Sequence, residues 1–288
     1  MPFSYSQDTH TVQLQNDIFR ELETSKLRYI ERLIDSVGMA APVADEQVVK
    51  HSAYVSSYHP FHRLPNYVVH VITKDILYGS QTRSNDFRPD PLIKNDMSDS
   101  LDYWNSGYDR GHMAASADFK WSRKALSESY YYSNIIPQNS GLNQGAWSKL
   151  EMQVREWAID NTELIVVTGP VLKNDLPKIP QGSYKVSIPA YLYKILLDYY
   201  PPKYKAIAFL YPNKNVPFEL EKHVVSIDSI EKLTGIDFFA KLDDSIENIL
   251  EAENNILDWD QHFLENEKAT EFVPKDFGKG KINTTQAK

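Results

Sequence analysis

Three short blocks between residues 108 and 151 concentrate the side chains that could carry chemistry. The blocks are Asp109-Arg110-Gly111-His112, Ser133-Asn134-Ile-Ile-Pro137-Gln138 and Leu142-Asn143-Gln144-Gly-Ala-Trp147-Ser-Lys-Leu150-Glu151. Hydrolysis of a phosphodiester needs an activated water, positive charge on the phosphoryl oxygens and help for the leaving alkoxide. Histidine, arginine and a metal ion bound by oxygen ligands supply these three needs, so the blocks indicate phosphate chemistry.

The third block is predicted to lie on a helix over residues 144–159, which would order its side chains. Asn143, Trp147 and Glu151 follow at intervals of four, so on a regular helix they lie within about 80° of one another around the axis. Asn143 and Glu151 are then about 12 Å apart along the axis, too far for both to bind one ion directly. Glu151 is therefore expected to act through metal-bound water.

The composition limits which metals and partners suit these blocks. The 288-residue chain has no cysteine, so a metal must be held by oxygen or imidazole ligands, which favours Mg2+, Mn2+ or Ca2+. The net charge of -8 argues against a protein that coats nucleic acid through long-range attraction. Basic residues nevertheless cluster around the blocks, namely Arg110, Lys120, Arg123, Lys124, Lys149 and Arg155. No apolar run approaches the roughly 20 residues that span a bilayer, so no membrane partner is expected.

Hydrophobic periodicity predicts an α+β fold, with a central and mostly antiparallel sheet flanked by helices. Strands are expected at residues 66–73, 164–168, 184–188, 191–197 and 205–211. Helices are expected at residues 12–36, 144–159, 226–233 and 245–263, the last of them acidic and amphipathic. The sheet and its helices must then position the three polar blocks.

The polar blocks resemble those of the DNA/RNA non-specific endonuclease family, whose active site is a ββα-metal finger. The resemblance runs from Tyr67 to about Leu233 and adds Thr82-Arg83 and Val167-Thr-Gly-Pro170 to the three blocks. It implies an α+β fold that carries the finger. On this basis residues 46–275 are expected to form the nuclease domain, residues 1–45 a helical extension and linker, and residues 276–288 a disordered tail.

The resemblance also implies a role for each matching residue. His112 would be the general base, and Asn143 would be the only protein ligand of a Mg2+ ion, or of Mn2+ as a substitute, otherwise held by water. Glu151 would order those metal-bound waters without contacting the ion itself.

The remaining matching residues would act on the phosphate or support the site. Arg83 and Arg110 would contact the phosphate, and Asn134 would support the site by hydrogen bonding. The chain departs from the family after His112, where Met113-Ala-Ala replaces a continuation that usually contains proline. This proline shapes a loop and donates no catalytic group, so the departure leaves the predicted roles unchanged.

The activity implied is Mg2+-dependent, sugar-non-specific cleavage of DNA and RNA to 5'-phosphate and 3'-hydroxyl ends. Two alternatives stay open at this stage. One is a nucleic-acid-binding protein without catalysis, and the other is a phosphodiesterase restricted to a small nucleotide or a special end. A homodimer and an inhibitor protein are left open as partners. Bacterial nucleases of this kind are commonly exported, so a secreted or periplasmic location is expected although no signal peptide is visible.

Several aromatic residues near the blocks are predicted to be structural. His59 and His62 are separated by a proline and lack an acidic partner nearby, so they are interpreted as structural or surface residues. His70, in the middle of a strand, is interpreted as a core histidine. The run Tyr130-Tyr131-Tyr132 is expected to pack the finger against the sheet rather than stack on bases.

Overall fold

The computed structural model describes residues 9–75, 79–94, 97–200 and 204–259. The chain divides into two compact units, residues 1–254 and residues 255–288. The second unit contributes one short described helix, Ile256–Asp258. The predicted tail at 276–288 and the end of the helix predicted at 245–263 lie outside the described residues. The predicted domain boundary after residue 45 stays a prediction.

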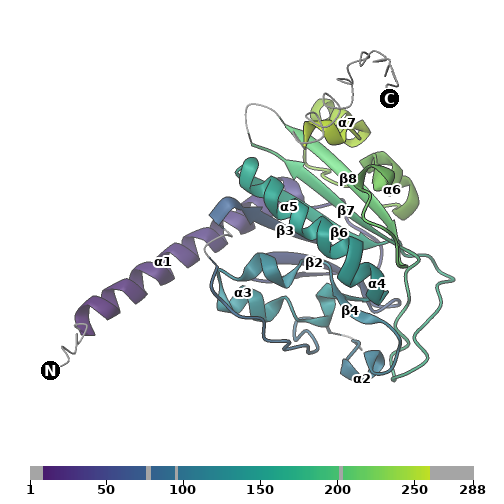
Figure 1. Ribbon diagram of the computed structural model, residues 1–288, viewed down its shortest axis with the longest axis horizontal. Coiled ribbons are helices and arrows are strands. Elements are labelled where there is room, and N and C mark those ends of the chain that lie inside the picture. Colours follow the sequence, from purple (N-terminus) through teal and green to yellow (C-terminus); the bar gives the residue numbers. More distant parts are fainter. Residues whose placement is uncertain (1–8, 76–78, 95–96, 201–203, 260–288) are drawn as a thin grey trace, which may run out of the picture. The chain divides into compact units, whose positions relative to one another are not determined.

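A seven-stranded antiparallel sheet forms the centre of the first unit, with strand order β1-β2-β3-β6-β7-β8-β9 (Figure 1). Its strands are β1 (Gln47–Lys50), β2 (Tyr54–His59), β3 (Leu64–Thr73), β6 (Glu163–Pro170), β7 (Tyr191–Asp198), β8 (Lys205–Pro212) and β9 (Val224–Val225). Strands β4 (Asp109–His112) and β5 (Ile135–Gln138) pair separately as a small antiparallel ribbon. This arrangement confirms the predicted α+β fold with an antiparallel central sheet.

Helices and single turns connect and cover the strands. The α-helices are α1 (Thr9–Leu33), α2 (Ser100–Tyr103), α3 (Arg123–Glu128), α4 (Ser140–Leu142), α5 (Ser148–Asp160), α6 (Ile227–Thr234) and α7 (Asp244–Ala252). Two π-helical turns cover Ile34–Gly38 and Asn143–Trp147, and short 3-10 turns cover Ser116–Phe119, Tyr132–Asn134 and Leu220–His223. No helix among the described residues is long and apolar enough to cross a membrane.

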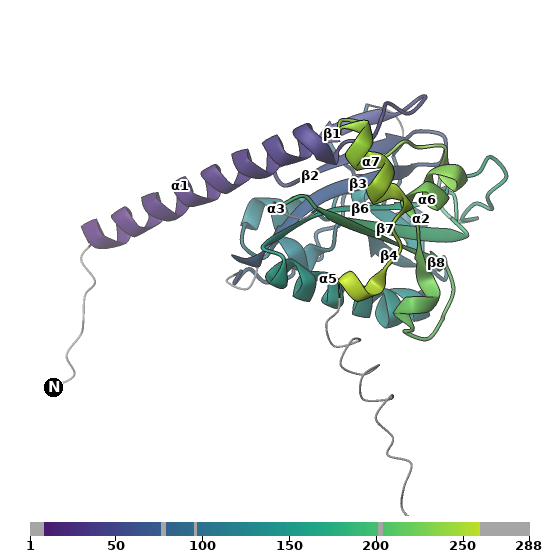
Figure 2. The ribbon, with the colours of Figure 1, turned by 90° about the horizontal axis from the view of Figure 1, so that it is seen from above.

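The two faces of the sheet are covered by different helices. Figure 2 shows α5 on one side of the strands and α6 and α7 on the other. Because successive side chains of a strand point to opposite faces, a strand covered on both sides is buried along its length. Every residue of β6 is accordingly buried, as is all of β3 except its last residue.

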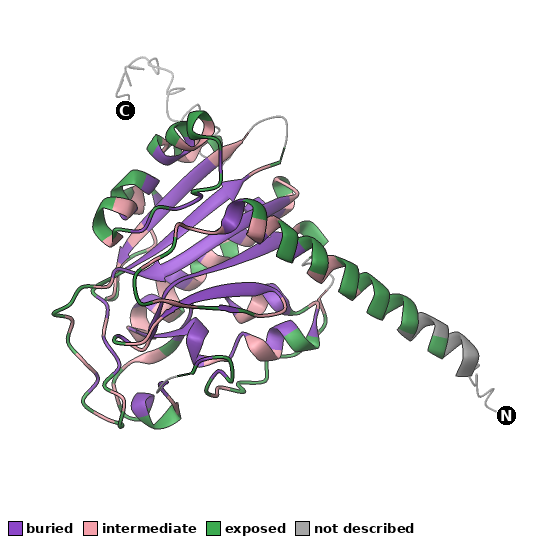
Figure 3. Ribbon diagram, turned by 180° about the vertical axis from the view of Figure 1, so that it is seen from behind, coloured by how far each residue is buried: buried purple, intermediate pink, exposed green. Residues whose placement is uncertain are grey.

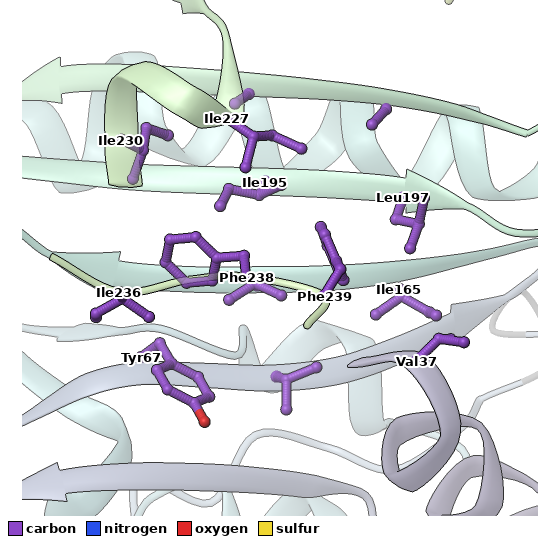
Figure 4. Close-up of a cluster of buried hydrophobic side chains, with 14 of the residues drawn as sticks. Val37, Tyr67, Ile165, Ile195, Leu197, Ile227, Ile230, Ile236, Phe238 and Phe239 are labelled. Atoms are coloured by element: carbon purple, nitrogen blue, oxygen red, sulfur yellow. The ribbon is translucent and has the colours of Figure 1, made fainter. Parts of the chain in front are cut away.

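One face packs against α6, α7 and the loop between them. Phe238 and Phe239 of this loop are 1% exposed and insert into a cluster with side chains of the central strands (Figure 4). The ring of Phe238 lies edge-on to Tyr67 and Tyr193, at centroid distances of 6.2 and 5.6 Å. These two side chains therefore anchor the loop in the hydrophobic core.

The other face packs against α5, which carries part of the third polar block. The indole of Trp157 stacks on Phe209 of β8 with ring centroids 6.1 Å apart. Trp147 meets Tyr211 of the same strand edge-on, also at 6.1 Å. Trp147 and Leu150 are fully buried.

The predicted N-terminal helix is present as α1 and continues into the turn Ile34–Gly38. Only its C-terminal end enters the core, where Ile30 and Ile34 are 1% exposed. Along the rest of its described length it is largely exposed (Figure 3), and Phe19 and Leu22 face solvent.

Two predicted elements outside the third polar block are wrong in type or extent. Residues 184–188 form no strand but one isolated bridge from Ser187 to Lys178, because Gly182 and Lys185 adopt φ angles of 70° and 55° that an extended strand excludes. The acidic helix predicted to reach residue 263 ends at Ala252. There Glu253 is extended, and the Asn255 side chain accepts a hydrogen bond from the Leu257 backbone and starts a new turn.

Candidate active site

The first two polar blocks form a small β-ribbon that leads into a helix. Strand β4 pairs with β5 so that Asp109 lies opposite Gln138 and His112 lies opposite Ile135. After β5 the chain turns through α4 and a π-helical turn into α5. Two strands and a helix thus bring residues from all three blocks into one region, which is the arrangement of a ββα finger.

Gly111 is required by close packing inside this ribbon. A Cβ atom at this position would overlap the side chain of Gln138, which lies across the ribbon and is fully buried. Gly111 has an ordinary φ angle, so the constraint is space and not backbone conformation. The glycine therefore allows β4 to lie close to Gln138 at the residue just before His112.

Asn134 holds the chain immediately after His112. Its Oδ1 accepts a hydrogen bond from the backbone N–H of Ala114 at 2.8 Å, and its Nδ2 donates to the carbonyl oxygens of Ala114 and Ser129 at 3.0 and 2.8 Å. The Asn134 side chain is fully buried. These bonds fix the backbone of Ala114, two residues after His112.

His112 is buried between aromatic rings at the end of β4. It is 8% exposed, and its ring lies 5.4 Å from Phe87 and 5.0 Å from Tyr130. Its Nε2 atom has no hydrogen-bond partner among the described residues. Burial, together with the positive charges of Arg83 and Arg110, lowers the pKa of His112 to about 3. The imidazole is therefore neutral at neutral pH.

Arg83 and Arg110 are exposed and line one groove of about 950 Å³ that Asn143 also lines. The Arg110 guanidinium lies 4.0 Å from the centroid of the Phe87 ring, which is cation-π distance. Arg83 donates from Nε to Oδ1 of Asn85 at 2.9 Å. Both arginines thus have defined positions at the groove and a positive charge for an anionic ligand.

Asp109 orients the amide of Asn143. Its carboxylate accepts hydrogen bonds from Asn143 Nδ2 and Gln144 Nε2, both at 2.9 Å, and from Ser140 Oγ at 2.6 Å. Burial alone would raise the pKa of Asp109, but these three hydrogen bonds lower it overall. Because Nδ2 of Asn143 is engaged, its Oδ1 stays available, and no described residue donates to it. Sequence reasoning missed this role, although Asp109 stands inside the first block.

The predicted regular helix through Asn143 and Glu151 is wrong. The chain breaks at Gly145, whose φ of -105° and ψ of -110° are not helical, and α5 begins only at Ser148. The angular and axial separations expected for an unbroken helix therefore do not apply. Glycine tolerates this backbone conformation, which other residues rarely adopt. Because of the break, the direction of the Asn143 side chain is not tied to that of Glu151 by helix geometry.

Glu151 is half-buried on α5 and has charged neighbours. Burial raises its pKa to about 7; nearby Lys194 opposes this rise and Asp118 adds to it. Lys194 is itself 2% exposed and donates from Nζ to Thr168 Oγ1 at 2.7 Å. Lys194 stands between Tyr193 and Ile195 in an otherwise apolar strand, and this was the sequence signal that could have revealed it.

Asp118 lies between Arg155 of α5 and His70 of β3. It accepts a hydrogen bond from Arg155 at 3.0 Å and lies 3.0 Å from Nε2 of His70. His70 is fully buried in β3, and burial lowers its pKa despite the attraction of Asp118. His70 is thus a core histidine, as the sequence suggested. Its partner Asp118 is one of the charged neighbours of Glu151.

The other aromatic residues singled out in the sequence pack within the protein. His62 is 2% exposed, and its Nδ1 lies 2.8 Å from Ser187 Oγ. Tyr132 is fully buried and stacks on Tyr103 at 5.4 Å, while Tyr130 packs against His112. These contacts are structural, in line with the sequence interpretation.

Known proteins similar to this chain are nucleases. The chain is 33% identical to the mouse (Mus musculus) protein "Nuclease EXOG, mitochondrial" over 231 residues, covering 75% of this chain and 62% of that protein. It is 32% identical to the human (Homo sapiens) protein "Endonuclease G, mitochondrial" over 208 residues, covering 67% and 69%. The match thus spans less than two thirds of the mouse relative.

A solved structure shares the fold as well. The crystal structure of the EndoG/EndoGI complex aligns with a TM-score of 0.64 and 29% identity, over 70% of this chain and 89% of that one. The similarity therefore extends to the backbone of most of the described protein.

The expected secreted or periplasmic location is wrong. Both relatives above carry the word mitochondrial in their names. The expectation rested on exported bacterial nucleases. The residues of an active site carry no information about where in the cell a protein is located.

The match to a family profile agrees with the geometry. Residues 34–245 match the family described as DNA/RNA non-specific endonuclease, and this range includes the β-ribbon, the kinked helix and every predicted site residue. The chain belongs to the DNA/RNA non-specific endonuclease family.

Proposed function

We propose that this chain is a Mg2+-dependent, sugar-non-specific endonuclease that hydrolyses DNA and RNA. The observation that carries the proposal is the buried, neutral His112 with an unpartnered Nε2 beside two groove-lining arginines. A neutral imidazole can accept a proton from water, and the arginines can hold the phosphate that the water attacks. The named relatives are nucleases, which supports the same activity.

His112 is the proposed general base. In the free protein its pKa is depressed by burial and then by Arg83 and Arg110. A phosphate bound between the arginines would offset their positive charge, and this would raise the pKa of His112 toward its ordinary value. The base would thus become stronger when substrate is present. Asn134 would keep the ring in place through its bonds to the following backbone.

The residues present fit a Mg2+ ion at Asn143. Its Oδ1 is available, its Nδ2 is fixed by Asp109, and oxygen is the ligand that Mg2+ prefers. Glu151 would hydrogen-bond to water molecules on the ion. When bound, the ion would neutralise charge on the phosphate and on the leaving 3'-oxygen, leaving a 5'-phosphate and a 3'-hydroxyl.

Lack of sugar preference follows from what the groove offers. Arg83 and Arg110 match phosphate oxygens by the geometry of their guanidinium groups, and phosphate contacts carry no sequence information. Hydrolysis by an external water does not need a 2'-hydroxyl. Both DNA and RNA should therefore be substrates.

Cleavage of a covalently closed plasmid and of RNA tests the proposal. With Mg2+ an endonuclease should linearise or nick the circle and degrade RNA, and EDTA should abolish both activities. A phosphodiesterase restricted to ends would leave the circle intact, and a binding protein would cut neither. Recovery of 2',3'-cyclic phosphates from RNA would contradict water attack, because such products require the ribose hydroxyl as nucleophile.

We also propose a mitochondrial location and an inhibitor protein as a partner. The names of the relatives support the location, and the solved EndoG/EndoGI complex, in which EndoG is inhibited, supports the inhibitor. Cell fractionation tests the mitochondrial location.

The homodimer stays a prediction. Sedimentation of the purified protein tests it.

A further inference from the structure

Five carboxylates gather on the side of the sheet away from the finger. Asp228 and Glu231 belong to α6, Asp237 belongs to the following loop, and Glu247 and Glu251 belong to α7. We call these five residues the α6–α7 carboxylates. They form two overlapping triads that share Glu251, and within each triad one oxygen of every residue lies within 4.8 Å of the others.

Glu251 is the member that points to a ligand. It is 8% exposed, and its Oε1 atom is buried without a hydrogen-bond partner among the described residues. Oε1 of Glu247 is also buried and unpartnered. A buried carboxylate oxygen without a partner is costly unless something with positive charge or a proton occupies the space before it.

No described side chain supplies that positive charge. None of the ion pairs between described residues involves the α6–α7 carboxylates. The cluster therefore consists of acidic groups alone, and a bound cation would compensate their charge.

The number of oxygens suits calcium. Each triad of carboxylates offers six oxygens, and calcium accepts six to eight oxygens in a flexible geometry. Mg2+ binds at about 2.0 to 2.1 Å in a strict octahedron and retains water, so it suits this set less well.

We propose that the α6–α7 carboxylates bind a structural Ca2+ ion, distinct from the proposed catalytic metal. Such an ion would join α6, α7 and the loop whose Phe238 and Phe239 fill the core beneath them (Figure 4). Glu247 and Glu251 lie beyond residue 245, where the family match ends. The site would therefore combine residues inside the family match with residues of α7 beyond it.

Calcium titration of the metal-free, full-length protein tests the proposal, with an Asn143→Ala background to remove the proposed catalytic site. Calorimetry should show Ca2+ binding in both proteins. A calcium concentration about 100-fold above Kd should raise Tm by about 5 to 10 °C. Glu251→Gln should weaken binding at least tenfold, and Asp237→Asn, at an exposed position, should weaken it without risk to the core.

Glu221→Gln is the matched control, because Glu221 is exposed and lies outside both triads. It should leave the affinity for calcium unchanged. Three results would overturn the proposal: no binding of Ca2+ to the Asn143→Ala protein at millimolar concentration, equal binding by Glu251→Gln, or binding of Mg2+ as tight as that of Ca2+. A Tm that rises on acidification but ignores calcium would show that the carboxylates share protons instead.

Discussion

The finger site and the α6–α7 carboxylates lie on opposite sides of the same sheet (Figure 2) and are built from opposite kinds of group. The finger presents a neutral imidazole, a neutral amide, two arginines and one carboxylate, Asp109, that accepts hydrogen bonds, whereas the second cluster presents only carboxylates. A neutral amide attracts a cation weakly, so the metal proposed at Asn143 would need the substrate phosphate to complete its shell. The carboxylates need no substrate, because they already carry the charge that a cation neutralises.

The backbones differ in the same way. The finger depends on the close approach of Gly111 to Gln138 and on a helix broken at Gly145. Four of the five carboxylates stand on two regular helices, one of which begins at a Ser226 cap and ends at left-handed Gly235, and the fifth, Asp237, stands on the loop that follows. In this protein, a metal coupled to catalysis would thus be placed by irregular backbone, while a structural ion would be placed by ordinary helix faces.

Loss of turnover in His112→Ala should be the strongest of the outcomes that separate the two regions. Removing a general base lowers the rate by about 100- to 10,000-fold, and binding of DNA in Mg2+ should be nearly unchanged. Single-turnover cleavage of plasmid and filter binding of the same DNA measure the two quantities. Full activity of His112→Ala would assign the base to another group and would remove the basis of the proposed mechanism.

Asn143→Ala and Glu251→Gln should separate the two metals. At limiting Mg2+, Asn143→Ala should lose activity by about 100-fold, because the ion would lose its only direct protein ligand and several kcal/mol of charge stabilisation with it. Glu251→Gln should keep the activity of the unmodified chain. Initial rates across a Mg2+ series measure both. Equal loss in the two variants would show that the sites are coupled.

Removing either groove arginine should have a weaker effect. Arg110→Ala or Arg83→Ala should reduce kcat/KM by about 10- to 100-fold, the range for a lost hydrogen bond to a charged group. Each should also reduce the salt dependence of DNA binding by about one unit of slope. Affinities between low and high salt give this slope. Lys120→Ala, at an exposed position near the finger, is the control.

The weakest effect is the dependence of stability on pH in EDTA. Burial, together with the negative charges of Glu231 and Glu247, raises the pKa of Glu251 to about 8. Its stabilising contribution to the free energy of unfolding is therefore fully present below about pH 4.5, the pKa in the unfolded chain, and is lost as pH rises through 8. The pKa of His112 is lowered to about 3, so its contribution is present above about pH 6.5 and is lost as pH falls toward 3.

Melting curves between pH 4 and 9 should show these opposite slopes, each of a few degrees. Glu251→Gln should flatten the alkaline side, and His112→Ala should flatten the acidic side. A Glu251→Gln protein that kept the alkaline slope would mean that another of the α6–α7 carboxylates holds the proton.

Local pattern was sufficient for the elements that bury apolar side chains. The strands at 66–73, 164–168, 191–197 and 205–211 are present because β-branched and aromatic residues suit a sheet covered on both faces. The strand expected at 184–188 is absent, since positive φ angles at Gly182 and Lys185 depend on the turns around them. β2 was missed because Ser56 and Ser57 look polar, although the Ser56 hydroxyl is satisfied by the carbonyl of Ser133.

The amino-acid types alone set the chemistry of the finger, because histidine, arginine and asparagine carry that chemistry wherever they stand. Tertiary packing set how these side chains face one another. It turned Asn143 through the break at Gly145 and fixed its amide with Asp109. It also placed Lys194 near Glu151 and brought Asp228 next to Glu251. These contacts join residues far apart in the chain, so their geometry depends on how strands and helices pack rather than on local spacing.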